Sequence, residues 1–425
     1  MSTSPSELLL PLELIHSIVD ICAEDDTPVD LLKTLTLVSP CLRPHARKRL
    51  WEHVFLPPKR ATWLAQQGKD YTEIVEGLAE VENLSALVKY LHLNPYPPGI
   101  LSHFLQKIHF VEVEHVFIQG YNARAPAATS PRVLAHFLSQ NSDLHTLDLS
   151  SARINAGALF ELLSQSRLRV LRTLRLNYLR ISTGDDEEEH LQELTWDAVS
   201  DLLLTRSGRI ERPSLQTLSL NTVLSNDTFT YAFFTHPKSL FDISLLQKLT
   251  LHISRSTNQA LFDFSNVIDL CCLSVQTLLI HGWQDVTSSE SYLLGRFQNA
   301  NQVELVIHGS GLGSDLNAQS PETSLSLAFP QLSILTRLRK LTIRLRFCLN
   351  AMTILNDSLN GMLRLLSRQL PGIQEICILV DGFTSYSVFS WNQDTQTLFQ
   401  ESRSYRGQQP LDLLQILMTA KPRTG

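Results

Sequence analysis

The chain has 425 residues, of which 43% are hydrophobic and 18% charged, and its formal net charge is −6. This length can bury a large core and allows about two or three domains. The acidic balance argues against a nucleic-acid-binding surface and against a polybasic patch for membranes.

Three further features bear on the compartment. No stretch reaches the ~18 apolar residues that a membrane span requires. The opening MSTSPSE has no basic region leading into an apolar stretch, so we expect no secretory signal. The six cysteines lack CxxC spacing and are typical of core thiols rather than of a disulfide framework. We therefore expect the protein in the cytoplasm, the nucleus or both.

The first predicted element is an amphipathic helix over LPLELIHSIVDI, residues 10–21. Its polar residues Glu13, His16, Ser17 and Asp20 are spaced as on one helical face, and Pro11 suits the first helical position. Apolar side chains fill the rest of the wheel. Such a face is too broad for a short segment to bury alone.

Two more helices are predicted next, over VDLLKTLTLV (29–38) and PCLRPHARKRLWEHV (40–54). Each follows a Ser or Thr that can cap it, with proline at the first helical position. The basic run 43–49 is expected to be a solvated helix face. Three short helices in about 45 residues form a bundle that is barely stable alone, and such a module usually completes its core with a partner.

These residues carry a family resemblance. LPLELIHSIVDI, followed by LLKTLTLVSPCLRPHARKRLWEHV, resembles the F-box, whose pattern combines Leu-Pro-x-Glu-Leu/Ile, a Leu-rich second helix ending in Val-Ser/Cys, and a closing Leu-Trp. The chain matches this pattern at Leu10, Pro11, Glu13, Leu14, Ile18, Leu32, Leu35, Val38, Ser39, Leu50 and Trp51. It departs from the pattern at Leu42, where many members carry Trp or Tyr. The alternative is an unrelated helical cap on the following domain.

The resemblance implies that this module docks on the Skp adaptor of a cullin-based ubiquitin ligase. It implies an apolar contact edge made by the first helix and the two later segments. The residues expected there are Leu10, Pro11, Glu13, Leu14, Ile15, Ile18, Val38, Ser39, Leu50 and Trp51.

A pattern of apolar, two residues, apolar, one residue, apolar recurs from residue 88 onward. Its ten copies have the middle anchors Leu91, Val116, Leu147, Leu174, Leu218, Leu249, Leu278, Leu305, Leu341 and Ile376. Successive anchors are mostly 25–36 residues apart, and one copy, QVELVI, has the polar Gln302 at its leading position. The pattern resembles leucine-rich repeats, in which a short strand is followed by a return segment. Irregular repeats of this kind are found in many F-box proteins, including the large fungal sets.

Return helices are predicted over PRVLAHFLSQ (131–140), AGALFELLSQ (156–165) and LNGMLRLLSR (359–368). A doubly wound α/β domain is the alternative, since it also alternates strands and helices. Its strands are usually continuous apolar runs, whereas these alternate polar and apolar residues. The alternation favours a solenoid with one open strand face.

Side chains one before, one after and three after each anchor are expected on this open face, because side chains alternate along a strand. The candidate substrate-binding residues are His252, His281, His308 and Arg344, three after their anchors, with Leu279 and Val306 beside them. The histidines permit three interpretations. A metal site would lack an obvious carboxylate or thiol, an anion or acidic-peptide surface would use Arg344, and the third is an ordinary polar sheet face.

Catalytic motifs are not evident. HGSGLGSDL (308–316) follows a strand but lacks the third glycine of a dinucleotide loop, since Ser314 occupies that position. GxSxG, HExxH, P-loop and kinase patterns do not occur. Cys271 and Cys272 are expected in the core. We therefore expect a non-catalytic protein without cofactor or metal.

The sequence thus predicts an α/β protein, with a three-helix F-box followed by a curved repeat solenoid whose parallel sheet lines the concave face. The expected parts are a disordered start (1–7), the F-box (8–56), a helical linker (57–86), about ten repeats (87–383) and a C-terminal cap or tail (384–425). The expected function is that of a substrate receptor in a Skp–cullin–F-box ubiquitin ligase, with an unidentified protein substrate. The rivals are a repeat scaffold outside any ligase and an enzyme with an unrecognised site.

Overall fold

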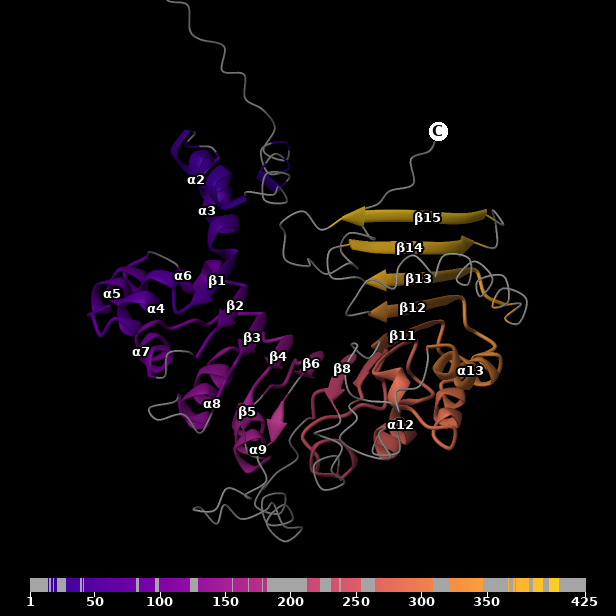
Figure 1. Cartoon of the computed structure of the whole chain (residues 1–425). Coiled ribbons are helices and arrows are strands. Elements are labelled where there is room, and N and C mark those ends of the chain that lie inside the picture. The colour runs from indigo at the N-terminus through magenta and orange to yellow at the C-terminus, as the bar shows by residue number, and fades with distance from the viewer. Residues whose placement is uncertain are drawn as a thin grey trace, which may run out of the picture. The chain divides into compact units, whose positions relative to one another are not determined.

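The chain forms two compact units in the computed structural model (Figure 1). Unit 1 comprises Met1–Leu215 with His236–Asp242, and unit 2 comprises Gln216–Thr235 with Ile243–Gly425. The structure describes residues 14, 17, 19–20, 28–38, 40, 42–81, 84–95, 99–122, 129–154, 156–166, 168–177, 179–181, 212–221, 231–236, 238–253, 264–308, 321–346, 366, 370, 372–381, 385–392 and 397–404. Within these ranges, no helix has both the length and the apolar character needed to cross a membrane.

Unit 1 begins with a small helical module. Helices α2 (Pro28–Val38) and α3 (Arg43–Glu52) pack together, and Leu14, Ser17, Val19 and Asp20 are also helical. The module has a small core of buried residues with partly buried leucines around it: Val19, Leu32, Ala46, Leu35, Leu42 and Leu50.

The sheet of unit 1 starts directly after this module. Its parallel strands, in spatial and chain order, are β1 (His53–Leu56), β2 (Tyr90–Leu93), β3 (His115–Gln119), β4 (Thr146–Ser150) and β6 (Thr173–Asn177). A second small sheet pairs β5 (Arg153–Ile154) with β7 (Arg180–Ile181). Sequence analysis missed β1, although WEHVFL repeats the apolar spacing, because its residues also fit the end of the preceding helix.

Helices connect these strands on one side of the sheet (Figure 1). They are α4 (Lys59–Gln66), α5 (Thr72–Ala79), α6 (Leu84–Leu87), α7 (Ile100–Lys107), α8 (Pro131–Gln140) and α9 (Ala156–Gln165). The predicted helices 131–140 and 156–165 are confirmed at both ends. Ser130 caps α8 by accepting a hydrogen bond from the backbone N–H of Arg132. The third predicted helix, 359–368, lies mostly outside the described residues.

Unit 2 continues the same repeat. Its parallel strands are β8 (Thr217–Asn221), β9 (Lys248–His252), β10 (Thr277–His281), β11 (Gln302–His308), β12 (Lys340–Arg346) and β13 (Glu375–Asp381), followed by antiparallel β14 (Ser385–Asn392) and β15 (Thr397–Ser404). The connections contain η2 (Tyr231–Thr235), α12 (Ser265–Cys271), η4 (Trp283–Asp285), η5 (Ser291–Arg296) and α13 (Pro321–Leu332). The expected α/β class with a parallel sheet is therefore confirmed.

The anchors form the core beneath the strands. The strand register aligns each anchor with the anchor of the neighbouring strand. The aligned anchors are Leu91, Val116, Leu147 and Leu174 in unit 1, and Leu218, Leu249, Leu278, Val303, Leu341 and Ile376 in unit 2. Each is at most 1% exposed. Cys271 and Cys272 are also buried, as predicted, and burial raises the pKa of the Cys271 thiol above its usual range.

The position four residues after the anchor ends several strands with a left-handed turn. Gly120, Ser151 and Gly282 occupy it with φ of 72°, 54° and 81°. Each donates its backbone N–H to a carbonyl of the next strand, at N···O distances of 2.9 Å. At Gly282, an added Cβ would clash with the carbonyl oxygen of Ile253, so only glycine fits there without a shift.

Candidate functional site

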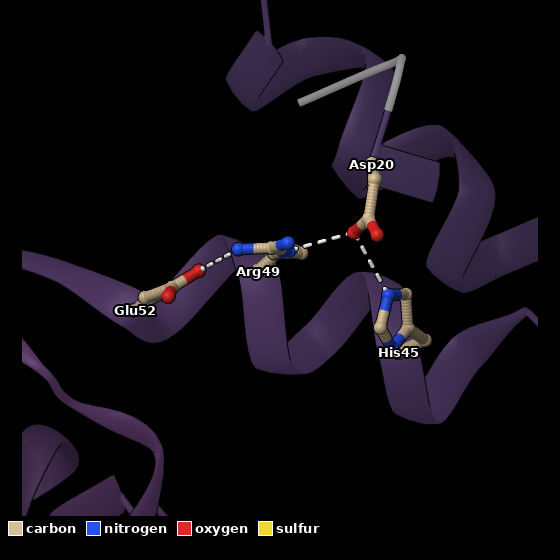
Figure 2. A network of polar contacts seen from close by, with 4 residues as sticks. All are labelled: Asp20, His45, Arg49 and Glu52. Atoms are coloured by element: carbon tan, nitrogen blue, oxygen red, sulfur yellow. Dashed lines mark hydrogen bonds and ion pairs between the residues drawn. The ribbon is translucent and has the colours of Figure 1, made fainter. Parts of the chain in front are cut away.

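A polar network joins the first helical residues to α3 (Figure 2). Asp20 Oδ1 accepts hydrogen bonds from Arg49 Nε at 2.8 Å and from His45 Nε2 at 3.0 Å. Arg49 also contacts Glu52 Oε2 at 2.7 Å through Nη1. The hydrogen bond from Arg49 lowers the pKa of the Asp20 carboxyl, and the two carboxylates raise that of the guanidinium. The network fixes how the segment containing Asp20 packs on α3.

The expected adaptor-contact residues are only partly within the described structure. Leu14 is helical and 51% exposed, Leu50 is partly buried against the module core, and Trp51 lies partly exposed near the end of α3. Val38 is the last residue of α2. Six others lie outside the described residues: Leu10, Pro11, Glu13, Ile15, Ile18 and Ser39. Leu37 of α2, which was not among the expected contacts, is 80% exposed.

The prediction that His252, His281 and His308 lie side by side in one row is wrong. His252 of β9 pairs with His281 of β10, but His281 pairs with Val306 of β11 and not with His308. His308 lies two residues farther along β11, opposite Arg346 of β12.

The error came from the anchor of β11. The true anchor is Val303, with the fully buried Ala300 at the leading position, rather than Leu305 behind the polar Gln302. Either Val303 or Leu305 fits the apolar spacing as the anchor, because β11 carries the run VELVI. Only the pairing of β11 with β10 shows which residue is aligned with the other anchors. Gln302 at a core position was the available warning in the sequence.

His252 and His281 form a stacked pair on unit 2. Their ring centroids are 4.2 Å apart and the planes differ by 9°. Burial lowers the pKa of His281 to about 2 and that of His252 to about 4, and the nearby Arg346 contributes to both shifts. Both imidazoles are therefore neutral at physiological pH. The Nδ1 atom of His281 is buried and has no hydrogen-bond partner.

Farther along unit 2, the face that was expected to be open is buried at two of the candidate positions. Val306 is fully buried and Arg344 is 6% exposed, so the expectation of an open face is not met at these two residues. Leu279 and His252 are half-buried, and His308 is exposed. The interior of β12 and β13 is buried on both faces.

The cations on this part of unit 2 are paired with carboxylates. Arg344 Nε lies 3.3 Å from Glu304 Oε1, Arg346 Nε lies 3.6 Å from Asp381 Oδ2, and Lys340 Nζ lies 2.9 Å from Glu375 Oε1. In these three pairs each positive charge is matched by one carboxylate, so the pairs themselves offer no excess positive charge to a phosphate or an acidic peptide. Among the described residues, no three His, Cys, Asp or Glu side chains are grouped to hold a metal ion.

Sequence analysis missed an aromatic cluster on the open face of β1–β3, here called the ring ladder. It consists of one row one before the anchors, His53, Tyr90 and His115, and one row one after them, Phe55, His92 and Phe117. Centroid separations are 4.2 and 4.4 Å along the first row and 4.3 and 4.6 Å along the second, with planes within 12° of parallel. Partial burial lowers the pKa of all three histidines.

The ring ladder ends at β1, the edge strand of unit 1. Phe55 is 65% exposed and His53 is also exposed. The signal for this site was present in HVFL, YLHL and HVFI, which carry rings at matching positions. Without β1 in the repeat count, the rows could not be aligned.

Comparison with known proteins does not assign the chain to a family. No known family profile matches the chain, and no curated protein matches it significantly.

Proposed function

We propose that the chain is a substrate receptor of a Skp–cullin–F-box ubiquitin ligase. In this proposal the N-terminal module binds the Skp adaptor, and through it a cullin, while the repeats form a leucine-rich-repeat solenoid that binds a protein substrate. The receptor has no catalytic role of its own. Holding the substrate beside the ligase raises its effective concentration, which makes ubiquitin transfer effectively intramolecular. Such a complex would work in the cytoplasm or nucleus.

One observation carries this proposal: the small helical module leaves large leucines in solvent. Leu14 is 51% and Leu37 is 80% exposed, although the described core of the module consists of only a few residues. Large exposed leucines on a bundle this small are what a module that completes its core with a partner would show. The matching F-box residues in the sequence indicate which partner.

Co-purification of the full-length chain with the Skp adaptor tests the proposal. We expect wild type to retain the adaptor, and Pro11→Ala combined with Leu14→Ala to lose most of it, because apolar contact area is removed. The matched control is Leu273→Ala, which removes a leucine that is 68% exposed in unit 2. Equal retention by wild type and the double variant would contradict the proposal.

The second candidate is a repeat scaffold that works outside any ligase, with the helical module only capping the repeats. The network of Asp20, His45 and Arg49 favours this candidate, because its hydrogen bonds hold the module together from within. Under this candidate the wild-type chain does not bind the adaptor at all.

We place substrate contact on the exposed parts of the repeat faces. The candidates retained on unit 2 are the stacked pair His252 and His281, together with Leu279 and His308. We expect His281→Ala to weaken substrate capture. If capture is unchanged for every partner, the pair has no part in substrate binding.

A further inference from the structure

The outer edge of β1 is free of other strands within the described residues. β1 stands at the end of the strand order, and its pairing is with β2 (Figure 1). The carbonyls of Glu52 and Leu56 accept from Lys89 and Asn94. Because alternate residues of a strand face opposite edges, the backbone N–H and C=O of Phe55 point away from β2. A further strand can therefore hydrogen-bond there.

The two rows of the ring ladder also end at this edge with uncovered rings. Successive rings in each row are 4.2–4.6 Å apart, close to the ~4.8 Å spacing of neighbouring strands. The terminal rings belong to His53 and Phe55, both exposed. A strand added beyond β1 would place its side chains at residues i and i+2 at the same stacking distance from these two rings.

Charged side chains lie beside the first residues of β1, β2 and β3, and they bear on which residue a bound segment would carry there. Two cations, Arg49 and Lys89, are shared there among four carboxylates: Asp20, Glu52, Glu112 and Glu114. Counting these groups alone, two positive charges against four negative leave two negative. Because α3 also carries the basic run 43–49, the local preference for Lys or Arg rests on Glu52, the carboxylate directly before β1.

We propose that the β1 edge binds an extended segment of another protein by parallel strand addition. The segment carries two ring side chains two residues apart, which continue the two rows of the ring ladder, and a Lys or Arg directly before the first ring. Backbone hydrogen bonds to Phe55 supply part of the affinity, and stacking on His53 and Phe55 supplies the sequence preference. This site does not depend on adaptor binding, so it goes beyond the proposed function.

Fluorescence anisotropy with the full-length chain tests the site. The probe is a labelled peptide, Ser-Lys-Tyr-Thr-Phe-Thr-Ser, and its control carries serine in place of both rings. We expect wild type to bind the probe more tightly than the control peptide. Phe55→Ala should weaken binding of the probe about two- to thirteenfold, the measured range for a stacked aromatic pair. Leu273→Ala should leave it unchanged.

A second variant separates stacking from strand addition. Phe55→Pro removes the ring and also the outward N–H, while the hydrogen bonds between β1 and β2 remain. It should weaken binding more than Phe55→Ala does, and thermal unfolding checks that both variants fold. Absence of probe binding to wild type at millimolar concentration, equal binding of both peptides, or full affinity of folded Phe55→Ala would each overturn the site.

The same variants keep this result apart from adaptor binding. Phe55→Ala should retain the Skp adaptor as wild type does, whereas Pro11→Ala with Leu14→Ala should still bind the probe.

Discussion

In unit 1, the residues one before and one after the anchors of β1–β3 are aromatic rings and imidazoles, and the outermost of them are exposed. In unit 2, the same positions on β11–β13 hold mostly charged and polar residues above a buried interior, namely Gln302, Glu304, Lys340, Thr342 and Glu375, with the buried Cys377 as the exception. The anchors beneath are alike in both units. The repeat therefore prescribes the core, while the outward positions are free to diverge into different surfaces.

The largest expected effects test whether the two cores are equivalent. Leu147→Ala in unit 1 and Leu278→Ala in unit 2 should each lower the free energy of unfolding by about 2–5 kcal/mol, because each deletes a fully buried side chain. Urea denaturation measures the loss. The control is Leu279→Ala, next to Leu278 but half-buried, which should cost clearly less. A much smaller loss at one anchor would show that the cores differ.

Substituting one carboxylate in each unit tests how the outward faces of the two units differ. Glu304→Gln in unit 2 should cost about 1–3 kcal/mol, because it leaves the buried guanidinium of Arg344 without its counter-charge. Asp148→Asn in unit 1 should cost less, since its partner Arg175, 3.7 Å away, is 43% exposed, and burial raises the pKa of Asp148. Denaturant unfolding compares the pair, and equal losses would contradict the distinction.

The strand-ending glycines give a smaller contrast at one repeat position. Gly282→Ala in unit 2 should destabilise by about 1–3 kcal/mol, because it combines a positive φ with a clash against Ile253. Gly120→Ala in unit 1 has the same backbone strain but open space around the added Cβ. Gly282→Ala should therefore have a lower thermal unfolding temperature than Gly120→Ala. The reverse order would be inconsistent with the packing.

Acidification should produce the most graded effect. The folded pKa of His281, about 2, is below its ordinary value of 6.5, so the unfolded chain takes up the proton first. Stability is full above about pH 6.5 and falls below it, with a slope of up to about 1.4 kcal/mol per pH unit per histidine. Unfolding at about pH 7 and pH 5 measures this slope.

Two matched variants test which unit causes the pH dependence of the free energy of unfolding. His281→Gln should flatten it more than His115→Gln does, because the shift at His281 is large while the pKa of His115 in unit 1 is lowered by partial burial. Indistinguishable slopes in the two variants would place the pH dependence elsewhere.

Much of the fold could be predicted from local pattern. Nine of the ten expected anchors and two return helices were located by the apolar spacing, because a strand or helix that buries one face needs apolar residues at fixed intervals. The misreading at Leu305 arose where the apolar run of β11 satisfies two registers. The missed strand β1 arose because four residues beside a helix carry too little periodic signal.

The candidate site was less predictable than the fold. Its rings are separated by more than 20 residues between strands, so only the register brings Phe55, His92 and Phe117 into one row. Likewise, the burial of Arg344 depends on everything packed around β12, which the alternation within one strand does not reveal.

The sequence by itself determined the α/β repeat, the positions of most core anchors and the resemblance on which the proposed function rests, since each depends on residues close together in the chain. Tertiary structure alone decided which outward side chains meet. It separated His308 from the stacked pair His252 and His281, and it aligned the ring ladder at β1, the strand at the end of the described order. The physical reason is that strand register is a long-range choice: shifting one strand by two residues preserves its buried face but changes every neighbour on the open face.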